Sequence, residues 1–124
     1  MTMKKHLAIV LALLSAGMIA TAADAHPKLV TTSPSADAVV TAPPDAIRLT
    51  FNENLNAKFS SIELKDTTGK KIETGSVTIE PGNKKQLILP FVAPLPAGAY
   101  DVAWHVVAGD THRIEGHYSF TVQP

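Results

Sequence analysis

Apolar and polar residues alternate in several short runs along the chain. Ile47, Leu49 and Phe51 fall on one face of an extended segment, and Arg48 and Thr50 fall on the other. The same period of two recurs in five later runs, at residues 62–64, 77–79, 87–89, 100–106 and 118–122. Alternation of this kind predicts strands with one buried face.

Turn-forming residues separate these runs, for example Pro81-Gly82-Asn83 and Ala108-Gly109-Asp110. Nine prolines and the lack of any long stretch with a 3.6-residue period argue against helices. Residues 52–60 are expected to form one irregular turn. About seven short strands at this spacing predict an all-β fold, a seven-stranded Greek-key β-sandwich, with Trp104 buried between its sheets.

The first 25 residues have the features of a secretory signal. Lys4 and Lys5 precede an apolar run over residues 7–14, and Ala23-Asp24-Ala25 supplies the small residues that a signal peptidase recognises. The apolar run is short for a membrane span. We therefore expect residues 1–25 to be a signal peptide cleaved after Ala25, and residues 26–124 to form one exported domain.

Composition narrows the chemistry of this domain. The chain has no cysteine, which excludes disulfides, thiolate catalysis and thiolate metal sites. All three methionines precede residue 26, so the predicted mature domain contains no sulfur. Its near-neutral charge lacks the basic footprint of a nucleic-acid-binding protein. The metal ligands available are His, Asp, Glu and a free amino terminus.

Cleavage after Ala25 would make His26 the first residue and create a candidate metal chelate. The α-amine and the imidazole Nδ1 of one residue can grip a metal together, in a geometry that suits the tetragonal field preferred by Cu(II). Pro27 has no backbone N–H, which blocks binding through the following amide. The alternative is that His26 is an ordinary solvated residue.

Further ligands are predicted in Asp110-Thr111-His112. In an extended segment, residues two apart project to the same face, so Asp110 and His112 would converge while Thr111 points away. With the terminal chelate they would supply three nitrogens and one oxygen, which fits Cu(II) and, less selectively, Ni(II) or Zn(II). From spacing alone, a turn aspartate beside an exposed histidine is the commoner explanation.

Glu53 follows an apolar strand and is a candidate axial ligand, or an acceptor that orients an imidazole. A solvated acid at a strand end explains the pattern equally well. His105 lies on the outward face of the Trp104 strand, and His117 is out of register with His112. Strand alternation sends both away from the predicted site, so we expect them to be ordinary surface or packed histidines.

The sequence resembles the CopC family of periplasmic copper-binding proteins, in the subgroup that includes the YobA-type proteins. The matching elements span the mature chain in the family's order. They are His26-Pro27-Lys28-Leu29, Phe51-Asn52-Glu53-Asn54-Leu55, Leu95-Pro96-Ala97-Gly98-Ala99-Tyr100, Tyr100-Asp101-Val102-Ala103-Trp104, Asp110-Thr111-His112 and Gly116-His117-Tyr118-Ser119-Phe120.

The resemblance implies a cupredoxin-like or immunoglobulin-like seven-stranded β-barrel. It also implies one Cu(II) per chain, held by the amine and imidazole of His26 with Asp110 and His112, and with Glu53 beside the site. Some members carry a methionine-rich loop for Cu(I). The mature chain here has no methionine, so we expect a Cu(II) site and no Cu(I) site.

These features favour a non-enzymatic, monomeric Cu(II) carrier or buffer in the periplasm, serving copper homeostasis or resistance. The resemblance implies an inner-membrane copper transporter of the CopD type as partner. Two alternatives belong to other classes. An amino-terminal copper chelate also resembles the site of lytic polysaccharide monooxygenases, although Asp110 would fill a position that an oxygen-activating centre needs open. The other is an exported immunoglobulin-like structural module with incidental metal affinity.

Overall fold

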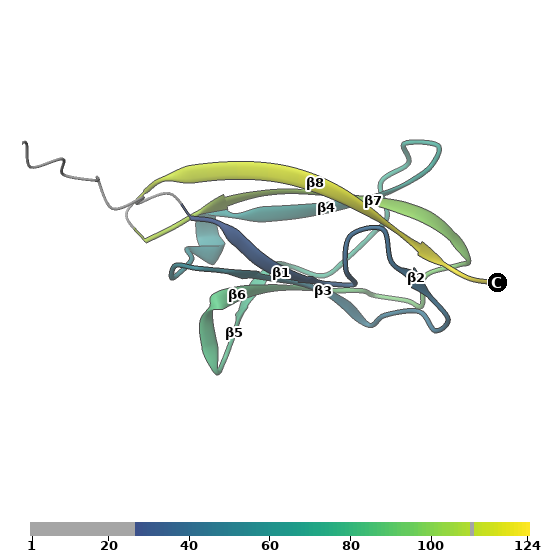
Figure 1. The fold of residues 1–124 in the computed structure, drawn as a ribbon, viewed down its shortest axis with the longest axis horizontal. Helices are drawn as coiled ribbons and strands as arrows, with labels where there is room; N and C mark the ends of the chain where they lie inside the picture. Colours follow the sequence, from purple (N-terminus) through teal and green to yellow (C-terminus); the bar gives the residue numbers. More distant parts are fainter. Residues whose placement is uncertain (1–26, 110) are drawn as a thin grey trace, which may run out of the picture.

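The computed structural model describes residues 27–109 and 111–124, which form two stacked four-stranded sheets (Figure 1). One sheet has the strand order β1-β3-β6-β5, and the other has the order β2-β8-β7-β4. The elements are β1 (Leu29–Ser33), β2 (Val39–Val40), β3 (Ala46–Phe51), the 3₁₀ turn η1 (Ala57–Phe59), β4 (Ser61–Asp66), β5 (Thr78–Glu80), β6 (Asn83–Pro90), β7 (Gly98–Val107) and β8 (Arg113–Val122).

The all-β sandwich predicted from the sequence is confirmed. Each alternating run coincides with a strand, from β3 to β8, and residues 52–60 form an irregular connection that contains η1. The described chain adds β1 and the two-residue β2 at the sheet edges. β2 pairs with β8 in parallel, and the other pairings between strands are antiparallel.

The core lies between the two sheets, where the inward residues of each alternating run meet. Ile47, Leu49, Leu64, Val102 and Val106 are fully excluded from solvent. Trp104 is 8% exposed, as expected for a residue between the sheets, and its ring meets Phe51 edge-on at 5.3 Å between centroids. This contact joins β7 of one sheet to the end of β3 in the other, because the two residues come from opposite sheets.

The β7–β8 hairpin is the longest ladder, with ten paired positions from Gly98↔Val122 to Val107↔Arg113. Within it Trp104 pairs with Gly116, and the indole lies over the glycine backbone. A Cβ added at Gly116 would lie 2.4 Å from Trp104 Cζ2 and 2.9 Å from Cε2. The position accepts only glycine without a shift of the ring.

The described part of the chain contains no helix long and apolar enough to cross a membrane.

The two ends of the described chain lie apart. β1 begins at the end of the sandwich that also carries the β7–β8 turn, and the carboxyl terminus lies at the opposite end (Figure 1).

The Gly116→Ala substitution is predicted to destabilise the domain by about 1–3 kcal/mol, because the new methyl group would overpack the space occupied by Trp104. Thermal unfolding measures this, at roughly 4–8 °C per kcal/mol for a domain of this size. Gly82→Ala is the matched control, since no heavy atom lies within 4 Å of a Cβ built there. Equal unfolding temperatures for wild type and Gly116→Ala would contradict the packing described.

Alkaline pH is predicted to destabilise the fold through Tyr118. Burial raises the pKa of Tyr118 to about 12, against about 10 for tyrosine in an unfolded chain. The buried neutral phenol therefore contributes stability that is complete below pH 10 and is lost as pH rises through 12. Urea unfolding measures the free energy of unfolding at pH 9 and at pH 11. The decrease between these two pH values should be smaller for Tyr118→Phe than for wild type, because phenylalanine cannot ionise. An identical loss in both proteins would assign the effect to other groups.

Candidate metal site

Three segments that are far apart in the sequence meet at the end of the sandwich where β1 begins. They are the residues before β1 (27–28), the connection after β3 (52–55) and the β7–β8 turn (108–112). Each of the four predicted ligands belongs to, or directly adjoins, one of these segments. The fold therefore gathers the parts of the chain from which a metal site was predicted.

The connection after β3 bonds to both of the other segments. Lys28 and Asn52 are linked twice, since Lys28 N–H donates to Asn52 Oδ1 at 2.6 Å and Asn52 N–H donates to Lys28 O at 3.0 Å. Two residues on, Asn54 O accepts from Gly109 N–H at 3.0 Å, and Leu55 forms a β-bridge with Ala108. Residues 52–55 thus fix the start of β1 against the β7–β8 turn.

The β7–β8 turn is tight rather than extended. Thr111 N–H donates to Ala108 O at 3.0 Å, Ala108 N–H donates to His112 O at 3.0 Å, and Thr111 has φ of 75°. Contrary to expectation, Thr111 is therefore not extended, and strand alternation does not hold at this residue. A threonine in the left-handed region is strained, because its Cβ approaches the backbone carbonyl.

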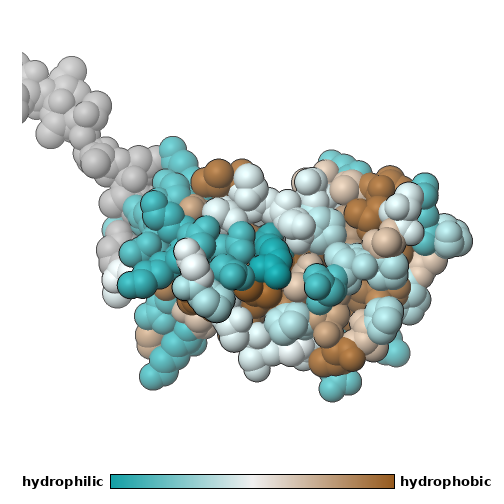
Figure 2. Space-filling view, turned by 90° about the horizontal axis from the view of Figure 1, so that it is seen from below, coloured by the Kyte–Doolittle hydropathy of each residue, from teal (hydrophilic) through white to brown (hydrophobic). Residues whose placement is uncertain are grey.

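Glu53 is half-buried beside this junction. It lines a shallow hollow of about 380 Å³ together with Asn52, Asn54, Lys85 and Gly109. Hydrophilic side chains gather at the same end of the molecule in Figure 2. Glu53 therefore shares this hollow with Gly109 of the β7–β8 turn, and one lysine, Lys85, lines it as well.

The structure places only part of the predicted ligand set. His112 is exposed and directly precedes β8, while His26 and Asp110 lie outside the described residues. Within residues 27–109 and 111–124, no three His, Cys, Asp or Glu side chains are grouped so that they could hold a metal ion. A centre with three such ligands at this end needs donors from outside those ranges.

His105 and His117 lie away from the junction, on the outer face of the β4-β7-β8 sheet. Both are exposed and line a shallow hollow of about 710 Å³ over that face. His105 Nδ1 lies 3.2 Å from Ser61 Oγ, at a position that pairs with Ser61 across the sheet. These are surface histidines, as strand alternation predicted.

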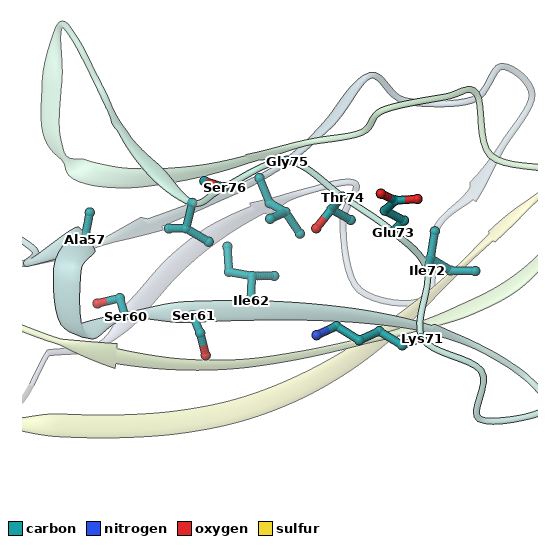
Figure 3. Close-up of a pocket in the computed structure, with 12 residues that line it drawn as sticks. Ala57, Ser60, Ser61, Ile62, Lys71, Ile72, Glu73, Thr74, Gly75 and Ser76 are labelled. Atoms are coloured by element: carbon teal, nitrogen blue, oxygen red, sulfur yellow. The ribbon is translucent and has the colours of Figure 1, made fainter.

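A separate groove of about 610 Å³ runs between β4 and the segment 71–77 that crosses to the other sheet (Figure 3). Ile62 projects into it from β4, and Lys71 and Glu73 line it from the crossing segment. Among the described residues that line it there is one carboxylate and no imidazole. Its donor set does not suit a transition metal, so it is not the candidate site.

Sequence reasoning missed Asn52 and Asn54, the residues that join the three segments. The visible signal was their position, since both asparagines flank Glu53 directly after an alternating strand. Asparagine is frequent in turns because its side chain can replace a backbone hydrogen-bonding group. Nothing in the local pattern indicated which distant segment each residue would bond.

Comparison with known proteins agrees with this architecture. A family model described as the CopC domain matches residues 29–123. Copper resistance protein C of Escherichia coli is 40% identical over 121 residues, covering 90% of this chain and 95% of that protein. Protein YobA of Escherichia coli strain K12 is 37% identical over 113 residues, covering 91% of each.

Solved structures give the same result. The crystal structure of PcoC, described as a methionine-rich copper resistance protein from Escherichia coli, superposes with a TM-score of 0.72 at 39% identity. The match covers 80% of this chain and all of that one. The molecule is thus a two-sheet β-sandwich of the kind built by CopC domains. The chain belongs to the CopC family.

Replacing Thr111 by asparagine is predicted to stabilise the domain by up to about 1 kcal/mol, because asparagine tolerates positive φ better than a β-branched residue. Chemical unfolding of the metal-free protein measures the change. The same substitution at Thr31, an exposed residue of β1, removes a β-branched side chain where strands favour one and should not stabilise. A loss of stability in Thr111→Asn would show that the threonine side chain has a compensating role.

Proposed function

We propose that this chain is a periplasmic Cu(II)-binding protein that carries or buffers copper in copper homeostasis or resistance. One Cu(II) is held by the α-amine and imidazole of His26 together with Asp110 and His112, and Glu53 lies beside the metal. The proposal includes cleavage of residues 1–25, since the chelate exists only when His26 carries a free amine.

The observation that carries the proposal is the junction formed by residues 52–55. It bonds Lys28, two residues after His26, and Gly109, the residue before Asp110. His112 closes the same turn through its carbonyl, which accepts from Ala108 N–H. Segments separated by more than 80 positions are thereby held at one end of the sandwich, where one ion can contact them.

The donor types support Cu(II) as the cargo. An amine, two imidazoles and a carboxylate are the nitrogen-rich, oxygen-completed set that a tetragonal Cu(II) ion prefers. Cu(I) prefers thiolates and thioethers, and residues 26–124 contain neither cysteine nor methionine. The chain therefore differs from the relative described as methionine-rich, and we assign it no Cu(I) site.

The family supports a role in copper handling without catalysis. The relatives at 37–40% identity include a protein named for copper resistance, and the alternative of an oxidative enzyme gains nothing from the comparisons. Acting as a monomer, the protein would deliver its copper to an inner-membrane transporter of the CopD type. Acid would release the metal, because the amine and both imidazoles bind copper only when deprotonated.

Extending the amino terminus tests the proposed chelate. The protein beginning at His26 is expected to bind one equivalent of Cu(II), with a tetragonal, nitrogen-rich electron paramagnetic resonance spectrum. One additional residue before His26 converts its α-amine into an amide and should abolish that spectrum, because the chelate formed by the amine and imidazole of one residue then no longer exists. Isothermal titration and Trp104 fluorescence follow the same binding event.

Two controls accompany this experiment. His112→Ala should also lose the spectrum, whereas His105→Ala should keep it, because His105 lies on the outer face of the sheet. Mass spectrometry of the exported protein should show removal of residues 1–25. Equal weak binding by the native and extended proteins would refute the terminal site and leave a CopC-family sandwich with another role.

A further inference from the structure

The pairing of β1 with β3 continues one step beyond Leu29, towards the predicted amino terminus, by means of a side chain. In the ladder Leu29 is opposite Phe51, so the next pair is Lys28 with Asn52. One bond of that pair is an ordinary backbone bond, from Asn52 N–H to Lys28 O at 3.0 Å. The other runs from Lys28 N–H to the side chain of Asn52, at 2.6 Å from Oδ1.

Lys28 N–H is the first backbone donor after His26, because Pro27 has no N–H. Pro27 is itself buried and its ring fixes its φ, so fewer backbone conformations are open to the residue directly before Lys28. A bond to Lys28 N–H therefore determines the direction in which the chain leaves β1. Asn52 is exposed, and this bond to Lys28 uses its side-chain oxygen.

The same short segment also fixes the other side of the junction. Asn54 O accepts from Gly109 N–H at 3.0 Å. Residues 52–54 therefore bond to Lys28 at one end and to Gly109 at the other. Glu53 stands between the two asparagines and lines the hollow there. Of the three hydrogen bonds described here between the described residues, the one to Asn52 Oδ1 uses a side chain, and it can be removed by substitution without changing the backbone.

We propose that Asn52 is a positioning residue for copper, which directs the amine and imidazole of His26 towards Asp110 and His112. The inference rests on the proposed function, since it concerns the same site. Asn52 does not itself contact the metal. It orders the segment before β1 when the protein folds, so that copper binding does not have to supply that ordering.

The test compares Asn52→Ala with wild type, both beginning at His26. The affinity for Cu(II), measured by competition with a chelator, should fall by about 10–100-fold in Asn52→Ala, the range typical for partners that orient metal ligands. The paramagnetic resonance spectrum should change, since His26 would no longer be held in one orientation. Asn52→Asp keeps an oxygen acceptor at the same position and should restore the affinity to within a few-fold of wild type.

Asn83→Ala is the matched control, because Asn83 Oδ1 also accepts a backbone N–H, that of Lys85 at 3.0 Å. That bond stays within one turn and joins no distant segments, so the copper affinity should not change. The unfolding temperature of each metal-free variant separates a general loss of stability from a loss of positioning. A positioning role requires reduced affinity in Asn52→Ala at an unfolding temperature close to that of Asn83→Ala.

The outcomes separate this inference from the proposed function. Wild-type affinity and an unchanged spectrum in Asn52→Ala, with the native spectrum still lost on amino-terminal extension, would overturn the positioning role alone. Failure of Asn52→Asp to restore the affinity would also overturn it, since the acceptor would then not be the relevant feature. If the extension leaves both the affinity and the spectrum of the wild type unchanged, the terminal site itself is refuted.

Discussion

The register of the β7–β8 hairpin is the constraint on which the candidate site depends. Ten consecutive pairs leave no freedom in where the strands turn, and the Trp104 ring over Gly116 allows only one alignment. A slip by one residue would bring a side chain beneath the indole and would exchange the inner and outer faces of β8. The position of the turn, and with it that of His112, follows from packing in the core.

The inter-sheet contact between Trp104 and Phe51 extends this constraint to the opposite sheet. Phe51 is the last residue of β3, and Asn52 follows it directly. The ring of Phe51 packs against Trp104 of the hairpin, so the connection that leaves β3 starts next to a residue fixed in the core. The polar junction at the surface is therefore built on an aromatic pair in the core, and the two are separated by a single peptide bond.

Most of the fold could be predicted from the sequence because its central strands have one face exposed to solvent and one face buried between the sheets. The alternation in residues 47–51 and 100–106 reports that geometry directly. Two of the four edge strands, β1 and β2, were missed, since every position of β1 is exposed or half-buried and β2 has two residues. Pairing of β2 with β8 depends on contacts between distant residues, which local periodicity does not contain.

For the candidate site, the sequence supplied a set of possible ligands but not the geometry of the chain that carries them. His112 and Glu53 lie at the end of the sandwich where β1 begins, and the ligand roles of His26, Glu53, Asp110 and His112 all stay predictions. The bend at Thr111 was not foreseen, because β-branched residues rarely adopt positive φ and the sequence offers no glycine at that position. Asn52 was overlooked for a different reason. Its hydrogen bond matters because the partner, Lys28, lies 24 positions away, and the sequence does not show which distant residue a side chain will bond.

The separation of the two ends of the described chain has a practical meaning (Figure 1). Everything proposed for metal exchange lies where β1 begins, and Pro124 lies at the far end of the long axis. The proposed metal site and the carboxyl terminus therefore lie at opposite ends of the molecule (Figure 1). A solid support or a fluorescent label joined after Pro124 would leave the end that carries the proposed metal site facing the solvent. The domain is therefore suited to immobilisation in one orientation.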